Sequence, residues 1–158
     1  MNHLLGKILV SSPTIGDENF KNTILFIVEH NEKGAIGFVI NKIFEHSLNE
    51  LTEFSHIRSF PLYKGGPVDK EHLFFIHCKN NLIDNGSLIM DNIYFGGNFN
   101  QVITEINNKN VSTMDIKIFI GYCGWNANEL ETEIAEGSWL VFDSSIEMVF
   151  AQNPDLFI

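Results

Sequence analysis

The sequence predicts a single α+β domain with mixed strand order over residues 1–158. Short runs rich in β-branched and aromatic residues recur along the chain, and several short segments carry apolar residues at helical spacing. No linker, internal repeat or low-complexity tract divides the 158 residues. A chain of this length buries roughly 70% of the surface that its unfolded form exposes, so the fold needs no disulfide.

The amino-terminal part of the chain predicts a short strand followed by a hairpin. Residues 7–11 form a strand that ends at Ser12-Pro13, because proline cannot donate a ladder hydrogen bond. Residues 22–30 have a nearly continuous apolar centre, which is typical of a strand covered on both faces. A short polar turn joins them to residues 35–40, so the two runs predict a hairpin.

Helices are predicted where capping residues precede apolar residues at helical spacing. Asp17 is expected to cap a tight turn or a single helical turn, and Ser47 to cap a short surface helix. A longer helix is expected at residues 98–108. Asp143 is expected to cap a last helix that runs through Phe150.

Further strands are predicted at residues 60–67, 72–78 and 139–142, and residues 87–97 predict a hairpin that turns at Asp91-Asn92.

Two glycines precede a proline in Gly65-Gly66-Pro67. This sequence permits a backbone geometry that side chains would block, so it is interpreted as a tight turn. An anion-binding loop is the alternative, but no lysine follows directly.

Residues 118–140 contain more signals of secondary structure than any other part of the chain. They predict a buried strand that stops at Gly121 and Gly124, then a short acidic helix and a second strand. Asn126 is the expected N-cap of the helix, and Glu129, three residues on, is expected to close a capping box.

The composition of the chain limits the classes of partner that the protein is expected to bind. The formal net charge is -10, which disfavours direct binding to nucleic acid, because that binding depends on neutralising phosphates. Two cysteines and no recognisable leader predict a cytoplasmic protein. No apolar run approaches the ~20 residues that span a bilayer, so no membrane association is expected.

Three segments resemble the AlgH/YqgE family of bacterial proteins, in the family's order: LVSSPTIGDENFKNTILFIVEHNEKGAIGFVIN, then GGPV, then GYCGWNANELETEI with SWL. The resemblance covers essentially the whole chain. It implies a single-domain fold whose mixed, bifurcated β-sheet curls into a pseudo-barrel with flanking helices. It also implies a cytoplasmic protein with a regulatory association and a transcriptional role, but no known reaction. The positions that match the family's motifs are Ser12, Pro13, Asp17, Phe20, His30, Gly34, Gly37, Asn41, Gly65, Gly66, Pro67, Gly121, Tyr122, Gly124, Trp125, Leu130, Glu131, Glu133 and Trp139.

The chain departs from the family pattern at three places. Asn41 is followed by Lys42-Ile43 rather than by a proline-containing turn, and Asn128-Glu129 stands where glycine-glutamine is usual. Cys123 stands where alanine is usual, so the resemblance implies no thiol chemistry there.

These matches gather at strand ends and turns, where loops on a rigid scaffold commonly carry function. His30 ends one strand of the hairpin and Asn41 ends the other, so the two are expected to share one rim with the turn at residues 122–125. The candidate binding rim consists of His30, Asn41, Tyr122, Trp125, Glu131 and Glu133.

Each candidate also has a structural interpretation. His30 is expected to be a hydrogen-bonded structural histidine unless it serves as a ligand or a general base. Glu131 or Glu133 is expected to accept hydrogen bonds from backbone N–H groups of the neighbouring turn. The helix face with Glu129, Glu133 and Glu136 is interpreted as solvated, with a cation or basic-partner surface as the alternative.

Cys123 is interpreted as an inert buried thiol. A redox role is the alternative, because a nearby helix N-terminus lowers a thiol pKa. His72 and His77 lie five positions apart on a strand and therefore on opposite faces, which disfavours a metal site. The chain has no Gly-x-Ser-x-Gly, Walker, Gly-x-Gly-x-x-Gly or His-Glu-x-x-His motif, so no catalytic set, metal or cofactor is predicted.

The sequence thus favours a cytoplasmic, non-enzymatic binding or regulatory module whose partner is a protein or a small molecule. The alternative is a hydrolase-like enzyme with His30 as general base and Asp17 or Glu133 as the orienting carboxylate. A transcriptional regulator is a third hypothesis, which the net charge disfavours.

Overall fold

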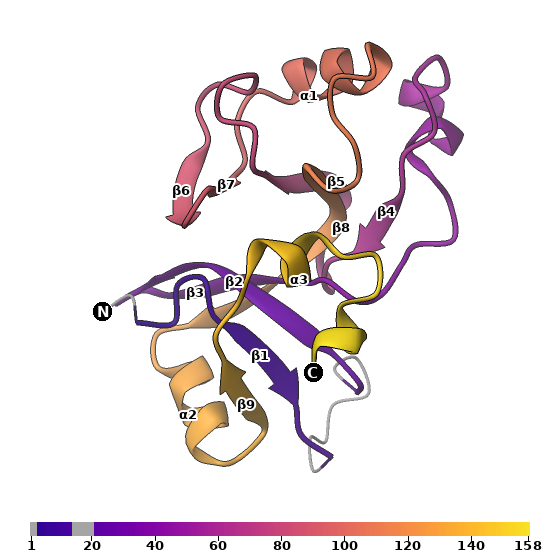
Figure 1. Cartoon of the computed structure of the whole chain (residues 1–158). Coiled ribbons are helices and arrows are strands. Elements are labelled where there is room, and N and C mark those ends of the chain that lie inside the picture. Colours follow the sequence, from indigo (N-terminus) through magenta and orange to yellow (C-terminus); the bar gives the residue numbers. More distant parts are fainter. Residues whose placement is uncertain (1–2, 14–20) are drawn as a thin grey trace.

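The computed structural model describes residues 3–13 and 21–158. The strands in this part are β1 (Ile8–Ser11), β2 (Ile24–Asn31), β3 (Gly34–Val39), β4 (Leu62–Lys64), β5 (Val68–His77), β6 (Ser87–Met90), β7 (Ile93–Phe95), β8 (Ile116–Asn126) and β9 (Trp139–Phe142). The α-helices are α1 (Phe99–Asn107), α2 (Glu129–Ala135) and α3 (Ile146–Phe150). Figure 1 shows α1 with β4 to β7 at one end of the molecule, and α2 with β1, β2, β3 and β9 at the other.

The strands form one sheet in the order β6-β7-β5-β8-β3-β2-β1-β9, with β4 also paired to β8. The sheet is therefore bifurcated at β8. β4 runs parallel to β8, whereas the other described pairs are antiparallel. The α+β class, the mixed strand order and the bifurcation are confirmed. The sheet stays open rather than closing into a barrel, because β6 and β9 remain its two ends.

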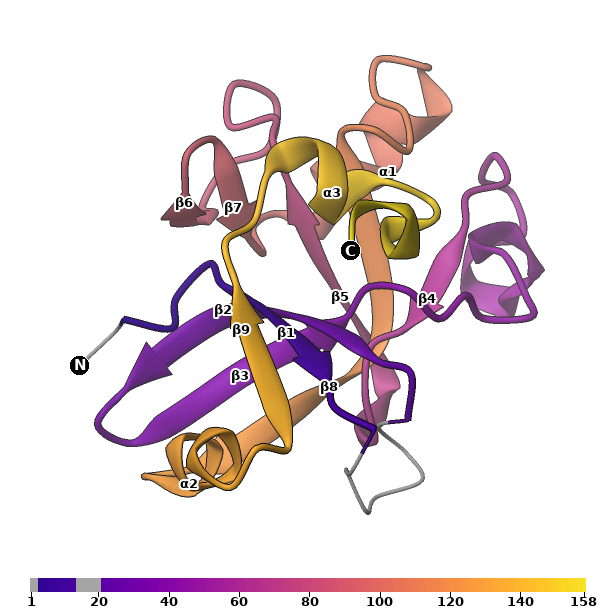
Figure 2. The same ribbon diagram turned by 60° about the horizontal axis from the view of Figure 1, so that its bottom comes forward.

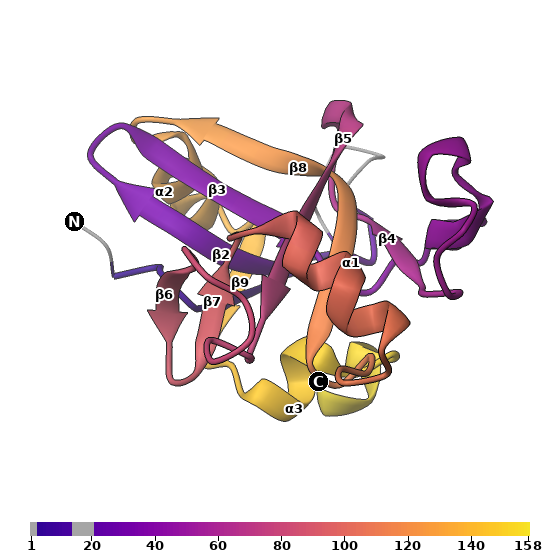
Figure 3. The ribbon, with the colours of Figure 1, turned by 90° about the horizontal axis from the view of Figure 1, so that it is seen from above.

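β8 is the strand that joins the two halves, as the views in Figures 1 and 3 show. Its first residues pair with β4 and β5, and its last residues pair with β3. The prediction that the strand stops at Gly121 and Gly124 is wrong. Gly121 has a φ of 73°, and this left-handed residue redirects the strand while the ladder continues through Asn126.

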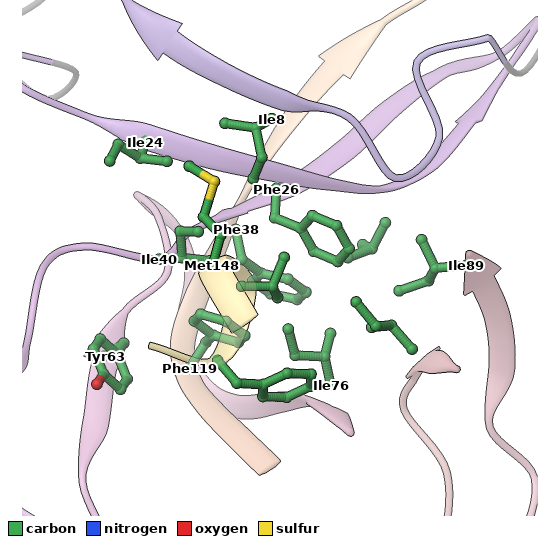
Figure 4. Close-up of a cluster of buried hydrophobic side chains, with 14 residues drawn as sticks. Ile8, Ile24, Phe26, Phe38, Ile40, Tyr63, Ile76, Ile89, Phe119 and Met148 are labelled. Carbon is green, nitrogen blue, oxygen red and sulfur yellow. The ribbon is translucent and has the colours of Figure 1, made fainter. Parts of the chain in front are cut away.

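The hairpin of β2 and β3 is confirmed, and β2 is covered on both faces as predicted. Ile24, Phe26 and Val28 contribute to the central apolar cluster, which also takes in α3. Leu25 and Ile27 contribute to a second cluster, under α2. Figure 4 shows the central cluster, in which Phe38 and Phe119 stack with ring centroids 4.4 Å apart.

The predicted helices in the described part of the chain form, with changes in helix type and in the residues that start them. A helix forms within residues 98–108, as expected, and Asn98 caps it through its side chain. The segment after Ser47 forms two 3-10 turns, Leu48–Glu50 and Thr52–Phe54, rather than an α-helix. Ser47 and Glu50 form a capping box there.

The residues expected to start the last two helices are displaced. α3 is capped by Ser145, whose hydroxyl accepts from the Met148 N–H, while Asp143 pairs with Lys7 instead. α2 begins at Glu129 after Asn128, which has a φ of 68°. Glu129 nevertheless accepts the backbone N–H of Asn126, so half of the predicted capping box is present.

The first predicted turn is only partly described. The strand β1 is confirmed, and the Ser12 N–H donates to the Ser138 carbonyl at 2.9 Å, which extends the pairing of β1 with β9. Pro13 follows as an exposed turn residue. Asp17 and Phe20 lie outside the described residues. No helix in the described part of the chain is long and apolar enough to span a membrane.

Candidate functional site

The residues of the predicted binding rim lie at opposite ends of the β2–β3 hairpin. His30 pairs with Ala35, and Ala35 pairs with Trp125, so His30 and Trp125 lie near the hairpin turn. Asn41 lies at the open end, beside Ile24. The expectation that His30 and Asn41 share a rim is wrong, because the end of one antiparallel strand lies opposite the start of the next.

His30 is a buried histidine with both ring nitrogens engaged. The backbone N–H of Leu4 donates to Nδ1 at 3.4 Å, so Nε2 carries the proton and donates to the Glu131 carboxylate at 2.8 Å. The His30 side chain has no exposed surface. Both ring nitrogens therefore have partners within the protein, and the ring is closed to a substrate.

Glu131 is the carboxylate that holds His30. Its hydrogen bond from His30 is the largest cause of a pKa below the ordinary value of 4.5. The half-buried side chain keeps 28% of its surface exposed. A charged acceptor on α2 thus ties this helix to β2.

Glu133 holds two indoles with one oxygen. Its Oε1 accepts from Trp139 Nε1 at 2.8 Å and from Trp125 Nε1 at 3.1 Å. The two indole rings meet edge to face with centroids 6.5 Å apart. We call the set of His30, Glu131, Glu133, Trp125 and Trp139 the α2 clamp.

The α2 clamp supports the structural interpretation of the two glutamates, with different partners from those expected. The donors are side-chain N–H groups of an imidazole and two indoles, not backbone N–H groups. Both glutamates therefore hold α2 against the sheet. Because the hydrogen bonds within the clamp use these polar atoms, few of them remain available to a ligand.

Asn41 and Tyr122 also have structural contacts. The Asn41 carboxamide accepts the Ile24 N–H and donates to the Asn22 carbonyl, each at 3.0 Å, which completes the end of the hairpin. The Tyr122 ring meets Phe74 edge to face with centroids 5.4 Å apart.

The Gly65-Gly66 motif lies next to Gly121, where the segment between β4 and β5 crosses the backbone of β8. A Cβ on Gly65 would lie 2.3 Å from the Gly121 carbonyl oxygen, and one on Gly66 would lie 2.2 Å from the Tyr122 carbonyl carbon. Any side chain at these two positions would collide with β8. This close approach explains the two glycines and sets Pro67 at the surface, beside the crossing.

A pocket of about 340 Å³ lies beside this crossing, near the place where Figure 2 shows β4 next to β8. Its apolar wall consists of Val39, Phe44, Pro67 and Ile120. The volume falls within the range of roughly 300–1,000 Å³ that is typical of small-molecule sites. The remaining lining residues are Gly66 and three lysines, Lys42, Lys64 and Lys70.

The three lysines come from three different segments. Ile43 pairs with Tyr63 in an antiparallel bridge, which puts Lys42 directly opposite Lys64. Lys70 lies on β5, in the irregular part of its pairing with β8. Lys42 is half-buried, and Lys64 and Lys70 are exposed.

The positive charge of these lysines is not neutralised by carboxylates of the described residues. Within residues 3–13 and 21–158, none of the three forms an ion pair. The Lys42 ammonium donates to the Lys21 carbonyl at 2.8 Å. Burial lowers the pKa of Lys42, Lys64 lowers it further, and Cys123 opposes the shift.

Sequence reasoning missed this pocket. The interpretation of Gly65-Gly66-Pro67 as a tight turn considered only a lysine directly after it, whereas Lys64 precedes it and Lys70 follows three residues later. Lys42 was visible only as a departure from the family pattern. No local spacing could have placed it opposite Lys64.

The other chemical candidates have ordinary surroundings. Cys123 is buried, and its Sγ lies 3.5 Å from the Gly65 carbonyl oxygen, which favours the inert interpretation. Exposed His72 contacts Asp69, and buried His77 contacts the Gly96 carbonyl. No group of three or more His, Cys, Asp or Glu in the described residues is arranged to hold a metal ion.

Known proteins match the chain over nearly its whole length. A UPF0301 protein of Chlorobium limicola is 39% identical over 146 residues, which cover 92% of this chain and 78% of the relative. A UPF0301 protein of Chlorobaculum tepidum is 38% identical over 149 residues, covering 94% and 79%.

Two solved structures share the fold. The solution structure of the AlgH protein from Pseudomonas aeruginosa has a TM-score of 0.76 and 28% identity, covering 96% of this chain and 83% of that one. A protein of Corynebacterium diphtheriae has a TM-score of 0.75 at 21% identity, covering 92% and 78%. The model of the AlgH-like family matches residues 8–157. The chain therefore belongs to the AlgH-like family, as the resemblance in its sequence motifs predicted.

Proposed function

We propose that the protein is a cytoplasmic, non-enzymatic binding or regulatory module, and that its ligand site is the pocket beside the glycine crossing. The observation that carries this proposal is the pocket itself, which combines an apolar wall with three lysines that lack carboxylate partners in the described structure. Ligand sites are commonly concave and mostly apolar, with a few convergent polar groups.

The α2 clamp is a weaker candidate for the site. His30 has no exposed side-chain surface, and its nitrogens and the Glu133 oxygen already have partners. The hydrolase alternative requires that His30 be accessible to act as general base. It also requires Asp17 or Glu133 as the carboxylate that orients the imidazole. The partner of His30 is Glu131 instead, so this geometry lends the alternative no support.

The site is testable without knowledge of the natural ligand. A library of small neutral and charged fragments is screened by protein-observed ¹H–¹⁵N NMR, and binders are expected to shift the amide signals of Val39, Lys64 and Gly66. Ile120→Trp fills the pocket and is expected to abolish these shifts. Leu88→Trp, at an exposed position on β6, is the matched control and is expected to retain them.

Lys70→Trp provides a second obstruction from an exposed position, in case the Ile120 variant is poorly folded. The proposal is contradicted when no fragment shifts the pocket amides, or when both obstructing variants retain fragment binding with a folded spectrum.

A further inference from the structure

The charge pattern around the pocket is unusual for this chain. Lys and Arg total 10 against 20 Asp and Glu, yet three of those ten basic residues line one pocket of about 340 Å³. Within residues 3–13 and 21–158, none of the three forms an ion pair with a carboxylate. The pocket is therefore a local positive site on a negative molecule.

Two of the lysines oppose each other across a strand pair. Like charges directly opposite on neighbouring strands destabilise a sheet. The bridge between Ile43 and Tyr63 fixes Lys42 opposite Lys64, so the repulsion between the two lysines follows from the backbone register. An anion bound beside the two lysines would relieve it.

Among the described residues, three carboxylates near this pocket lie outside its lining. Asp69, next to Lys70 in sequence, contacts His72. Glu71 and Glu53 line the adjoining groove rather than the pocket. The lysine end of the site therefore keeps its positive character.

The site continues beyond the lysines into that groove, which has a volume of about 460 Å³. Phe44, Lys70 and Ile120 line both spaces. The groove adds the apolar side chains of Leu51, Phe54 and Leu73. An occupant can thus place an anionic group among the lysines and an apolar body along Phe44.

Resting on the function proposed above, we infer that the ligand is a small phosphate monoester that carries an aromatic or other flat apolar group. Three ammonium groups match a doubly charged phosphate better than a singly charged carboxylate. The apolar continuation past Phe44 and Ile120 selects an organic ester over free inorganic phosphate. The volume fits a small molecule rather than a folded partner.

The test is a titration with phenyl phosphate, measured by calorimetry and by NMR shifts of the pocket amides. Benzoate, inorganic phosphate and the neutral benzyl alcohol are the comparison probes. Phenyl phosphate is expected to bind at least about tenfold more tightly than each of them, because only it presents both a dianion and a ring.

Charge-neutralising variants assign the binding to the lysines. The double variant Lys42→Met/Lys64→Met is expected to lose at least about tenfold in affinity for phenyl phosphate. Lys33→Met/Lys109→Met changes the net charge equally at exposed sites away from the pocket and is expected to lose less than about twofold. Lys70→Met, at an exposed position, repeats the test if the first double variant folds poorly.

Equal losses in the two double variants would overturn the inference, since they would show general electrostatic attraction only. Neutral fragments that bind the pocket while phenyl phosphate does not would overturn the ligand class and leave the proposed site intact. Failure of every probe and fragment at the pocket would overturn the proposed function itself.

Discussion

The backbone N–H of Lys64 donates to the carbonyl oxygen of Lys42 at 2.8 Å, which holds two lysines side by side at the pocket. The two side chains belong to directly opposite residues of an antiparallel pair, and no carboxylate pairs with either in the described structure. Their repulsion has a measurable consequence for stability.

Lys64→Met is expected to raise the free energy of unfolding by about 0.2–1 kcal/mol at low salt, because it removes a like-charge pair. Added salt is expected to shrink this gain by screening the repulsion in the wild type. Urea unfolding at two ionic strengths measures the effect. Lys33→Met is the matched control, and a Lys64 variant that is no more stable than the control would contradict the expectation.

Glu133→Ala is expected to destabilise the fold by about 2–5 kcal/mol, because it leaves the buried N–H groups of Trp125 and Trp139 without this acceptor. Glu133→Gln keeps a carbonyl oxygen and is expected to cost less. Glu136→Ala, at an exposed position on the next turn of the chain, is the control. Thermal and urea unfolding provide the measurement, and wild-type stability in both Glu133 variants would disprove the structural role.

The bond from His30 to Glu131 predicts an acid-sensitive contribution to stability. The folded pKa of Glu131 is lowered, so the folded state binds its proton less readily than the unfolded chain. The contribution is present above the ordinary pKa of 4.5 and is lost as the pH falls through the lower folded value. Glu131→Gln is expected to flatten the loss of stability between about pH 5 and pH 3.

Urea unfolding across this pH range compares the Glu131 variant with the wild type and with Glu136→Gln. The control is expected to keep the wild-type slope. Parallel pH profiles for all three proteins would show that Glu131 does not supply the contribution.

Lys117 predicts a further rise of stability with pH, in a higher pH range. It is 2% exposed, donates to the carbonyls of Ile40 and Ala151, and lies 4.3 Å from the Tyr63 ring centroid. Burial lowers its pKa from 10.5 to about 7. Between these values the unfolded chain binds a proton that the folded chain does not, so stability is expected to rise with pH.

The slope due to this group is at most about 1.4 kcal/mol per pH unit. Lys117→Met is expected to lack that component while being less stable overall, since two carbonyl groups lose their donor. Unfolding free energies from pH 7 to 10 test the slope, with Lys33→Met as the control. A Lys117 variant whose profile runs parallel to the wild type would refute the assignment.

Local pattern was sufficient for most strands and for α1. The apolar run around Phe26 and the helical spacing of Phe99, Val102 and Ile106 both depend on neighbours in sequence, so the strand and the helix could be predicted. Gly121 was misinterpreted because a glycine with positive φ ends a strand in one context and bends it in another. Only the partners β5 and β3 decide between the two.

The site was less predictable because its contacts are long-range. The α2 clamp joins residues 101 apart in sequence through His30 and Glu131. The pocket joins Lys42 to Lys64 and Lys70 through strand register. Two residues of the family motifs, Gly66 and Pro67, line the pocket, but the motifs did not mark the lysines.

The proposal to be tested is that the pocket beside the glycine crossing binds an aromatic phosphate monoester. A crystal structure of the protein saturated with phenyl phosphate tests it most directly. Phosphate oxygens are expected roughly 2.7–2.9 Å from the Nζ atoms of Lys42 and Lys64, with the ring against Phe44. Phenyl phosphate bound elsewhere on the molecule, with this pocket holding only solvent, would contradict it.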